Sequence, residues 1–175
     1  KLMAGGGVSS IYDPLDVTQY TEAEIRAAVE AAENWGTYVT VHAYTPRAIQ
    51  QAIRAGVKCI DHGQLIDEET VKMMVEKGVF WSLQPFVDEG DKGVLSAESR
   101  AKQLEMYQGT DTAFELAKKY KMKIAYGTDV LFDAQKAARP DLQLLKMKRW
   151  FSNLEILKMS NGNNGELLAL SGKRS

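Results

Sequence analysis

The sequence has little of several features that mark common classes of protein. Cys59 is its only cysteine, which excludes an internal disulfide and leaves a small side chain suited to an apolar core. No run of apolar residues approaches the roughly 18 that a membrane helix requires. The 22 lysines and arginines nearly balance the 23 aspartates and glutamates, for a formal net charge of −1. This balance gives no reason to expect nucleic acid or a membrane as a partner.

Motifs of several common enzyme classes are also absent. The glycines of AGGG at 4–7 form neither a phosphate-binding loop nor a dinucleotide fingerprint. No serine lies in the context of a nucleophile elbow. Apolar residues nonetheless make up 45% of the 175 residues, which is enough for a substantial core. We therefore expect one globular domain over residues 1–175, without an internal boundary.

What the sequence does contain is a repeated alternation of short apolar strands and helices. Thr21 and Glu24 have capping-box spacing at the start of the first helix. Helical patterns also include a long stretch at about 96–120, in which Gly109 is a candidate break, and a helical tail interrupted at Asn161-Gly162. The pattern predicts five strands, at 1–3, 38–41, 57–60, 79–83 and 122–126. Such units form a parallel sheet, which is either an open doubly wound sheet or part of an eight-stranded barrel.

The residues that could bind a ligand or take part in a reaction lie at the ends of the predicted strands. In parallel α/β folds, ligands bind at the carboxyl ends of the strands. The only two histidines, His42 and His62, follow consecutive strands, and Asp129 follows the last strand. Each alone has a structural explanation, since a histidine can be a hydrogen-bonded core residue and an aspartate can cap a helix. Together they favour a catalytic metal site, because imidazole and carboxylate groups are natural ligands of zinc-like ions.

Four segments, in order and spacing, resemble the amidohydrolase superfamily: KLMAGGGV at 1–8, VHAY at 41–44, IDHG at 60–63 and YGTD at 126–129. The chain is most similar to the group that contains imidazolonepropionase-like enzymes and metal-dependent Xaa-Pro dipeptidases (prolidases). This resemblance implies a partial (β/α)8 TIM barrel, namely strands four to eight with their helices. Strands one to three and the β-sandwich of the family would be lacking. Residues 1–175 would then be a fragment, the C-terminal part of the metal-dependent barrel domain.

The resemblance also implies roles for five residues. Lys1 matches a lysine that reacts with carbon dioxide to give a metal-bridging carbamate. His42 and His62 match metal ligands, and His62 would also help to hold the oxyanion. Asp129 matches an aspartate that binds metal and shuttles a proton, and Tyr44 matches a substrate contact. The implied cofactor is a divalent metal, zinc, as one or two ions.

The function that the resemblance implies is hydrolysis of an amide C–N bond in a small molecule, an Xaa-Pro dipeptide or an N-acyl amino acid. Metal-activated hydroxide would attack the carbonyl, and Asp129 would transfer the proton. A cyclic amidohydrolase of the imidazolonepropionase type and a catalytically incomplete structural fragment stay open as alternatives. The family's H-x-H pair of strand one is absent, so we expect the isolated chain to be inactive.

Partners and compartment are less constrained by the sequence. Unpaired edges of a partial barrel predict a homo-oligomer or association with the missing barrel half. A chain that begins at Lys1 neither reveals nor excludes a signal peptide. The compartment therefore stays open, although the cytoplasm is favoured.

Overall fold

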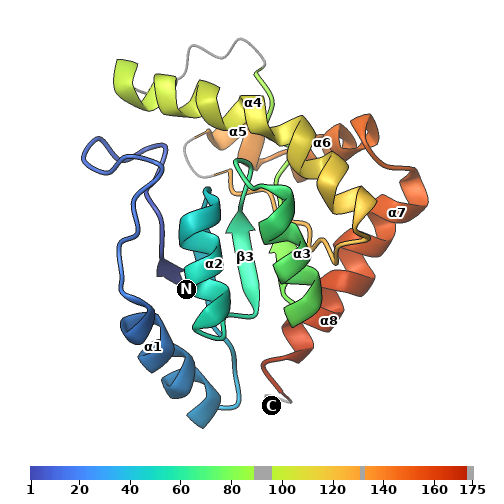
Figure 1. The fold of residues 1–175 in the computed structure, drawn as a ribbon. Helices are drawn as coiled ribbons and strands as arrows, with labels where there is room; N and C mark the ends of the chain where they lie inside the picture. The colour runs from blue at the N-terminus through green and yellow to red at the C-terminus, as the bar shows by residue number, and fades with distance from the viewer. Residues whose placement is uncertain (89–95, 131–132, 173–175) are drawn as a thin grey trace.

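A parallel four-stranded sheet organises the fold in the computed structural model, which describes residues 1–88, 96–130 and 133–172 (Figure 1). The strands lie in the order β1-β2-β3-β4, with every neighbouring pair parallel. Their bounds are Leu2–Met3 for β1, Thr40–Ala43 for β2, Cys59–His62 for β3 and Phe80–Ser82 for β4. The register pairs Met3 with His42 and Ala43 with His62. All strand ends that carry candidate site residues therefore meet at one edge of the sheet.

The two histidines lie within the strands, whereas the sequence pattern placed them just after the strands. Backbone pairing continues past the expected ends, since Gly5 N donates to His42 O at 3.0 Å and Gly63 N donates to Ala43 O at 2.9 Å. Strands β2 and β3 are correspondingly displaced toward the C-terminus relative to the predicted ranges. Both imidazoles are consequently carried by hydrogen-bonded backbone and not by loops.

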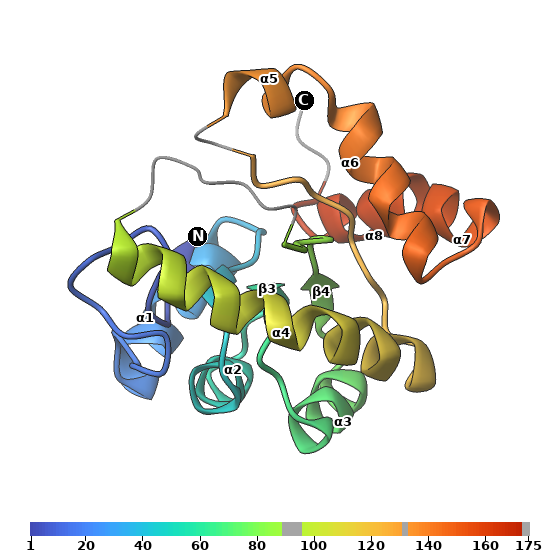
Figure 2. The ribbon, with the colours of Figure 1, turned by 90° about the horizontal axis from the view of Figure 1, so that it is seen from above.

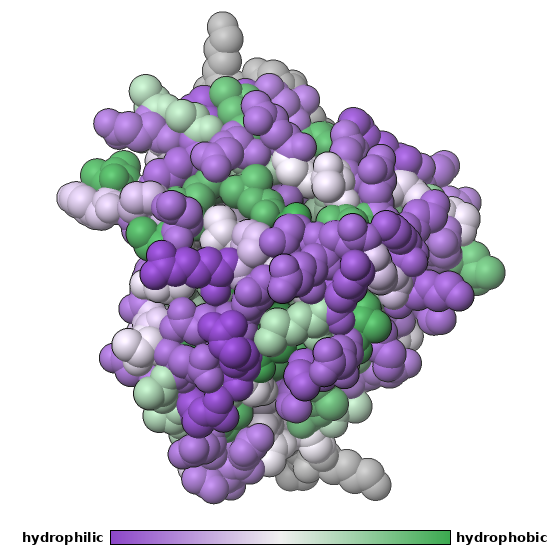
Figure 3. Space-filling view, in the orientation of Figure 1, coloured by the Kyte–Doolittle hydropathy of each residue, from purple (hydrophilic) through white to green (hydrophobic). Residues whose placement is uncertain are grey.

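Three helices cover one face of the sheet. Figure 2 shows α1 (Glu22–Asn34), α2 (Pro46–Arg54) and α3 (Glu68–Lys77) in a row along this face. The predicted capping box of α1 is confirmed, because Thr21 and Glu24 exchange side-chain and backbone hydrogen bonds. The main core lies between helices and strands and includes Ile25, Ile49, Ile60, Met74 and Trp81. Figure 3 shows that the surface turned to the viewer, over these helices, is mainly hydrophilic with scattered hydrophobic patches.

The long helix α4 (Ala97–Lys119) crosses the end of the molecule toward which the arrow of β3 points (Figure 1). It runs through Gly109 without interruption, so the predicted break at this glycine is wrong. A Cβ at position 109 would lie 2.1 Å from the backbone oxygen of Gln64. The glycine therefore serves close packing of α4 on the loop after β3.

The predicted fifth strand, 122–126, is reduced to a single parallel bridge between Ile124 and Trp81. Two backbone hydrogen bonds form it, from Trp81 N to Lys123 O at 3.0 Å and from Ala125 N to Trp81 O at 2.9 Å. Lys121 has a left-handed backbone (φ 50°) and Ile124 N donates to Met122 O, so the chain is curled at the start of this segment. The segment does pair in parallel, beside β4, but the predicted length of the strand is wrong.

Short helices complete the described chain: α5 (Ala134–Ala137), α6 (Pro140–Lys146), the 3-10 turn η1 (Met147–Arg149), α7 (Asn153–Leu157), the π-helix η2 (Lys158–Asn163) and α8 (Asn164–Ala169). The predicted interruption at Asn161-Gly162 is a widened π turn that joins α7 to α8. Asn163 Nδ2 donates to Ile124 O at 2.8 Å, which ties this tail to the segment beside β4. None of the helices in the described ranges has both the length and the apolar character needed to cross a membrane.

Candidate metal centre

The carboxyl ends of the strands surround a cavity of about 170 Å³. Its lining comes from β1, β3, β4 and the segment that follows Ile124. The lining residues are Lys1, Asp61, His62, Ser82, Gln84, Gly127 and Asp129. Three of the five residues singled out from the sequence, Lys1, His62 and Asp129, thus face one space.

The other two singled-out residues, His42 and Tyr44, contact His62. The ring centroids of His42 and His62 are 4.5 Å apart, and Tyr44 stacks on His62 at 5.0 Å with an interplanar angle of 28°. All three rings are buried, with at most 6% of their surface exposed. On the far side of His62, its Nε2 lies 3.8 Å from Asp129 Oδ2. The structure therefore brings together all the side chains that strand-end position had selected.

Unusual backbone conformations aim two of these side chains. His62 has φ 77° and Asp129 has φ 50°, in the left-handed region that non-glycine residues seldom adopt. In a regular strand, consecutive side chains point to opposite faces of the sheet. Asp61 and His62 nevertheless both line the cavity. The positive φ of His62 is the departure from strand geometry that allows this.

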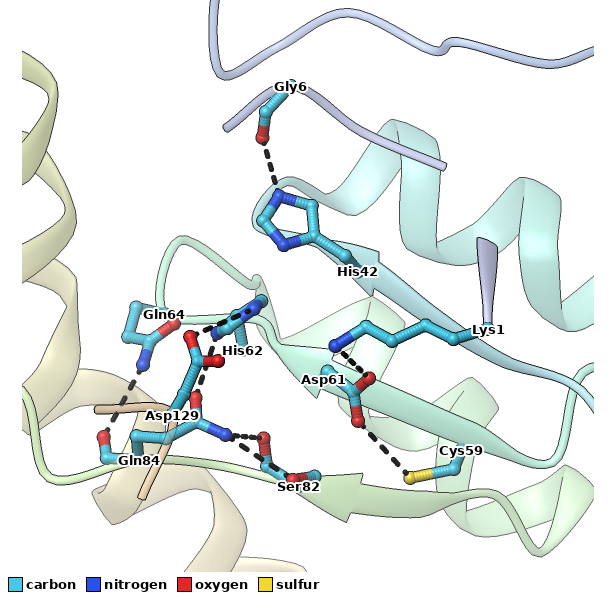
Figure 4. Close-up of polar contacts among 10 residues, drawn as sticks. All are labelled: Lys1, Gly6, His42, Cys59, Asp61, His62, Gln64, Ser82, Gln84 and Asp129. Carbon is cyan, nitrogen blue, oxygen red and sulfur yellow. Dashed lines mark hydrogen bonds and ion pairs between the residues drawn. The ribbon is translucent and has the colours of Figure 1, made fainter. Parts of the chain in front are cut away.

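Hydrogen bonds assign the protons on both imidazoles. His42 Nε2 lies 2.9 Å from Gly6 O, a carbonyl that can only accept, so Nε2 carries the hydrogen. His62 Nδ1 donates to Gln84 Oε1 at 2.9 Å (Figure 4). Burial lowers the pKa of His42, and burial together with repulsion from His42 and Lys1 lowers the pKa of His62 to about 3. Both rings are therefore neutral at neutral pH, with lone pairs left on Nδ1 of His42 and Nε2 of His62.

The chemistry of these donors, two neutral imidazoles and a carboxylate, is that of ligands to a cation of the zinc type. The lone pair of His62 Nε2 and a carboxylate oxygen of Asp129 face each other at 3.8 Å, beyond hydrogen-bond distance, with no proton between them. Two electron-pair donors in this relation favour a metal ion as their common partner, and neutral imidazole is the form that ligates. Across the described ranges, however, no group of three or more His, Cys, Asp or Glu side chains has a geometry that could hold a metal ion. Metal ligation by these residues stays a prediction.

Lys1 and Asp61 form an ion pair at the rim of the cavity. Lys1 Nζ lies 2.8 Å from Asp61 Oδ2, and the lysine side chain is 45% exposed. As an ammonium, Lys1 donates hydrogen bonds and cannot act as a metal ligand. Asp61 and Gln84 directly follow the predicted strands 57–60 and 79–83, but the sequence alone assigned them no role. Strand-end position was the signal available for both, and the structure adds their partners.

Comparison with known proteins places the chain in a family. Residues 1–172 match the amidohydrolase family model. A crystal structure of an amidohydrolase is 36% identical, with a TM-score of 0.87, over 96% of this chain and 41% of that chain. A prolidase complexed with N-methylphosphonate-L-proline is 35% identical, with a TM-score of 0.87, over 99% of this chain and 43% of that chain. Ochratoxinase from Aspergillus niger is 30% identical over 168 residues, which are 93% of this chain and 34% of that protein.

The chain spans about a third of the length of the ochratoxinase and about two fifths of the two solved structures. Its own length, by contrast, is matched almost completely by the family model. The parallel α/β architecture corresponds to part of the amidohydrolase TIM barrel. The chain therefore belongs to the amidohydrolase family, whose hydrolases are typically metal-dependent.

Proposed function

We propose that this protein is a metal-dependent hydrolase of amide bonds, acting on an Xaa-Pro dipeptide or an N-acyl amino acid. The observation that carries the proposal is the meeting of two neutral, buried imidazoles with the Asp129 carboxylate at the carboxyl end of a parallel sheet. The similar structures include a prolidase and an ochratoxinase, which supports an amide substrate of small size.

The strand order supports a place in the second half of a (β/α)8 barrel. In this proposal β1 to β4 are strands four to seven, and the segment 122–126 beside β4 is strand eight. Residues 1–175 then form the C-terminal part of the barrel domain. Helices α1 to α3 cover the outer face, and the site residues lie at the end of the barrel where such enzymes bind substrate.

The proposed ligands of a divalent ion, zinc by the chemistry of the donors, are Nδ1 of His42, Nε2 of His62 and the Asp129 carboxylate. When bound, the ion would polarise the scissile carbonyl and lower the pKa of a water molecule. A second ion would need a further anionic ligand. Lys1 would provide one after leaving Asp61: its ammonium would lose a proton, and the resulting amine would add to carbon dioxide and lose a second proton to give a carbamate.

The chain's own groups would move the proton and hold the substrate. Burial raises the pKa of Asp129, which suits a carboxylate that takes a proton from the attacking water and passes it to the leaving nitrogen. Burial also raises the pKa of the Tyr44 phenol, so its hydroxyl stays protonated and can donate a hydrogen bond to a substrate oxygen. Tyr44 would therefore stabilise the developing oxyanion. The part that the resemblance gave His62 in this is not kept, because its Nδ1–H is donated to Gln84 and its Nε2 is the proposed metal ligand.

Replacing Asp129 by asparagine tests the proposal. Asparagine tolerates the left-handed backbone of position 129, so folding is retained while the proton acceptor is lost. Loss of a general base costs about 10²- to 10⁴-fold in rate. We expect the zinc-loaded protein, in its full natural length, to release proline from Xaa-Pro dipeptides or the amino acid from N-acyl amino acids. The Asp129→Asn variant should lose at least about 10²-fold in turnover even at saturating zinc, where elemental analysis shows that the ion is bound.

Asp141→Asn is the matched control, because this aspartate is exposed and pairs with Arg139 outside the cavity. It should hydrolyse the same substrates at the wild-type rate. Near-normal turnover of Asp129→Asn would remove Asp129 from proton transfer. If the protein hydrolysed a hydantoin but neither linear substrate, the substrate would be a cyclic amide and not the one proposed. If the wild type did not retain zinc, the proposed metal centre would be contradicted.

A further inference from the structure

Gln84 contacts the His62 ring at Nδ1, whereas Asp129 faces Nε2 of the same ring. Its Oε1 accepts the hydrogen bond from His62 Nδ1 at 2.9 Å, and both side chains are 2% exposed. Its backbone is fixed as well, since Phe86 N donates to Gln84 O at 2.9 Å. Figure 4 shows the contacts as one series that runs from Ser82 through Gln84 and His62 to Asp129.

The contact with Ser82 determines the positions of the side-chain amide oxygen and nitrogen of Gln84. Gln84 Nε2 donates to Ser82 O at 2.9 Å and lies 3.3 Å from Ser82 Oγ. A backbone carbonyl only accepts, so the amide nitrogen must face Ser82 and the amide oxygen must face His62. That oxygen only accepts as well. The ring nitrogen next to it must therefore carry the hydrogen, and the lone pair of the neutral ring must be on Nε2.

Stacking alone does not select this orientation. Tyr44 and Phe86 lie nearly parallel to the His62 ring, at interplanar angles of 28° and 22°. These contacts fix the plane of the ring, but a half-turn of the ring about its Cβ–Cγ bond would keep that plane and the stacking. After the half-turn, a ring C–H would face Gln84 Oε1 and the buried amide oxygen would lose its partner, at a cost of about 1–3 kcal/mol. The hydrogen bond to Gln84 therefore distinguishes the two orientations, which the stacking contacts do not.

We propose that Gln84 is a positioning residue that holds His62 as the Nδ1–H tautomer and turns its Nε2 lone pair toward Asp129. The use of that lone pair as a metal ligand rests on the proposed function, whereas the tautomer and the orientation do not. Outer hydrogen-bond partners of ligating histidines act in this way, and their loss typically lowers metal affinity about 10- to 100-fold.

Long-range 15N–1H correlation spectra of the metal-free protein at neutral pH test the proposal. The chain has only two histidines, so two ring systems appear, and His42→Gln assigns them. In the wild type we expect Nδ1–H for His62 and Nε2–H for His42. Gln84→Met keeps the side-chain length but removes the acceptor, so His62 should shift toward the Nε2–H form that dominates for free histidine. Gln84→Glu keeps an acceptor and should restore Nδ1–H, while His42 stays Nε2–H in every variant.

Zinc affinity provides the second measurement. It should fall about 10- to 100-fold in Gln84→Met and recover in Gln84→Glu. An Nε2–H tautomer of His62 in the wild type, or an unchanged Nδ1–H tautomer in Gln84→Met, would overturn the proposal. The wild-type spectrum alone decides this if Gln84→Met does not fold. A tautomer shift as expected with no zinc binding by the wild type would uphold the positioning role and contradict the proposed metal function.

Discussion

His62 and Asp129 store backbone strain at the centre of the candidate site. A non-glycine residue in a sparsely populated backbone region costs on the order of 1–3 kcal/mol. Both residues have positive φ, and both point into the cavity. The surrounding hydrogen bonds, including Trp81 Nε1 to His62 O at 2.6 Å, hold the strained conformation. The third non-glycine residue with positive φ in the described chain, Lys121, lies in the turn before the segment 122–126, so two of the three strained residues line the cavity. Backbone strain at a cavity is typical of functional sites.

Glu68 illustrates a surface residue with a measurable pH dependence. Hydrogen bonds from Lys119 at 2.5 Å and from the Tyr120 hydroxyl lower the pKa of Glu68 from its ordinary 4.5 to about 2. A carboxylate whose pKa is lower in the folded than in the unfolded state stabilises the fold above the unfolded value. We expect this contribution to be complete above pH 4.5 and to disappear as the pH falls toward 2. Urea unfolding of wild type and Glu68→Gln should therefore differ at neutral pH and converge in acid.

The neighbouring Glu69 provides a control for this measurement. It lies in the same first turn of α3 but is not among the hydrogen-bond partners of Lys119. Glu69→Gln should follow the wild-type pH dependence. The effect of Glu68→Gln is expected to be small, because exposed ion pairs are screened by solvent. A constant difference between wild type and Glu68→Gln from neutral to acid pH would contradict the assignment.

At the scale of the element, Gly109 sets α4 against the loop after β3. Alanine in a helix interior is ordinarily favoured over glycine by about 1 kcal/mol. At position 109 the added Cβ would meet Gln64 O at 2.1 Å and Gln64 C at 2.9 Å, both of which are backbone atoms. Overpacking of this kind costs about 1–3 kcal/mol, so the clash should outweigh the gain in helix propensity. We expect Gly109→Ala to lower the free energy of unfolding, measured by urea denaturation.

Gly165 in α8 is the matched site for comparison, because a Cβ there would have no atom within 4 Å. Gly165→Ala should raise the free energy of unfolding by about 0.5–1 kcal/mol, the ordinary advantage of alanine. The two substitutions are chemically identical, so opposite signs would isolate the packing against Gln64. Equal stabilisation by both would show that α4 can move away from the loop.

Local signals predicted the elements that depend on neighbouring residues. The capping box of Thr21 and Glu24 was predicted from their spacing in the sequence, and it is present at the start of α1. The predictions were wrong where contacts with residues distant in the sequence, or a turn without a sequence motif, determine the local structure. The sequence predicted a helix break at Gly109, but the glycine is needed because the backbone of Gln64 packs against the helix there. It predicted a full strand at 122–126, but the turn at Lys121 shortens the paired segment. Patterns of hydrophobicity do not contain this information.

At the scale of the whole molecule, the parallel strands predicted that His42, His62 and Asp129 lie at the same end of the sheet. The carboxyl ends of parallel strands share one end of the sheet, where such folds bind ligands. The partners of these residues could not be predicted in the same way. The bonds from Lys1 to Asp61 and from His62 to Gln84 depend on side-chain orientation, and for His62 on a backbone conformation that no local motif specifies.

The edge of the sheet gives the last prediction. Within the described ranges, β1 pairs with β2 on one side and with no strand on the other. Unpaired edges of this kind recruit further strands, and lysine on an edge strand prevents it. We therefore expect the purified chain to form oligomers through β1, observed as a sedimentation coefficient that rises with protein concentration.

Met3→Lys should weaken this association, because Met3 lies in β1 and is 43% exposed. Leu142→Lys is the matched control, since Leu142 is 44% exposed but lies on α6, in the helical tail. If exposed apolar surface alone drove association, the two substitutions would act equally, so a selective effect of Met3→Lys would assign the contact to the strand edge. A folded wild-type monomer at every concentration would mean that the free edge of β1 recruits no strand.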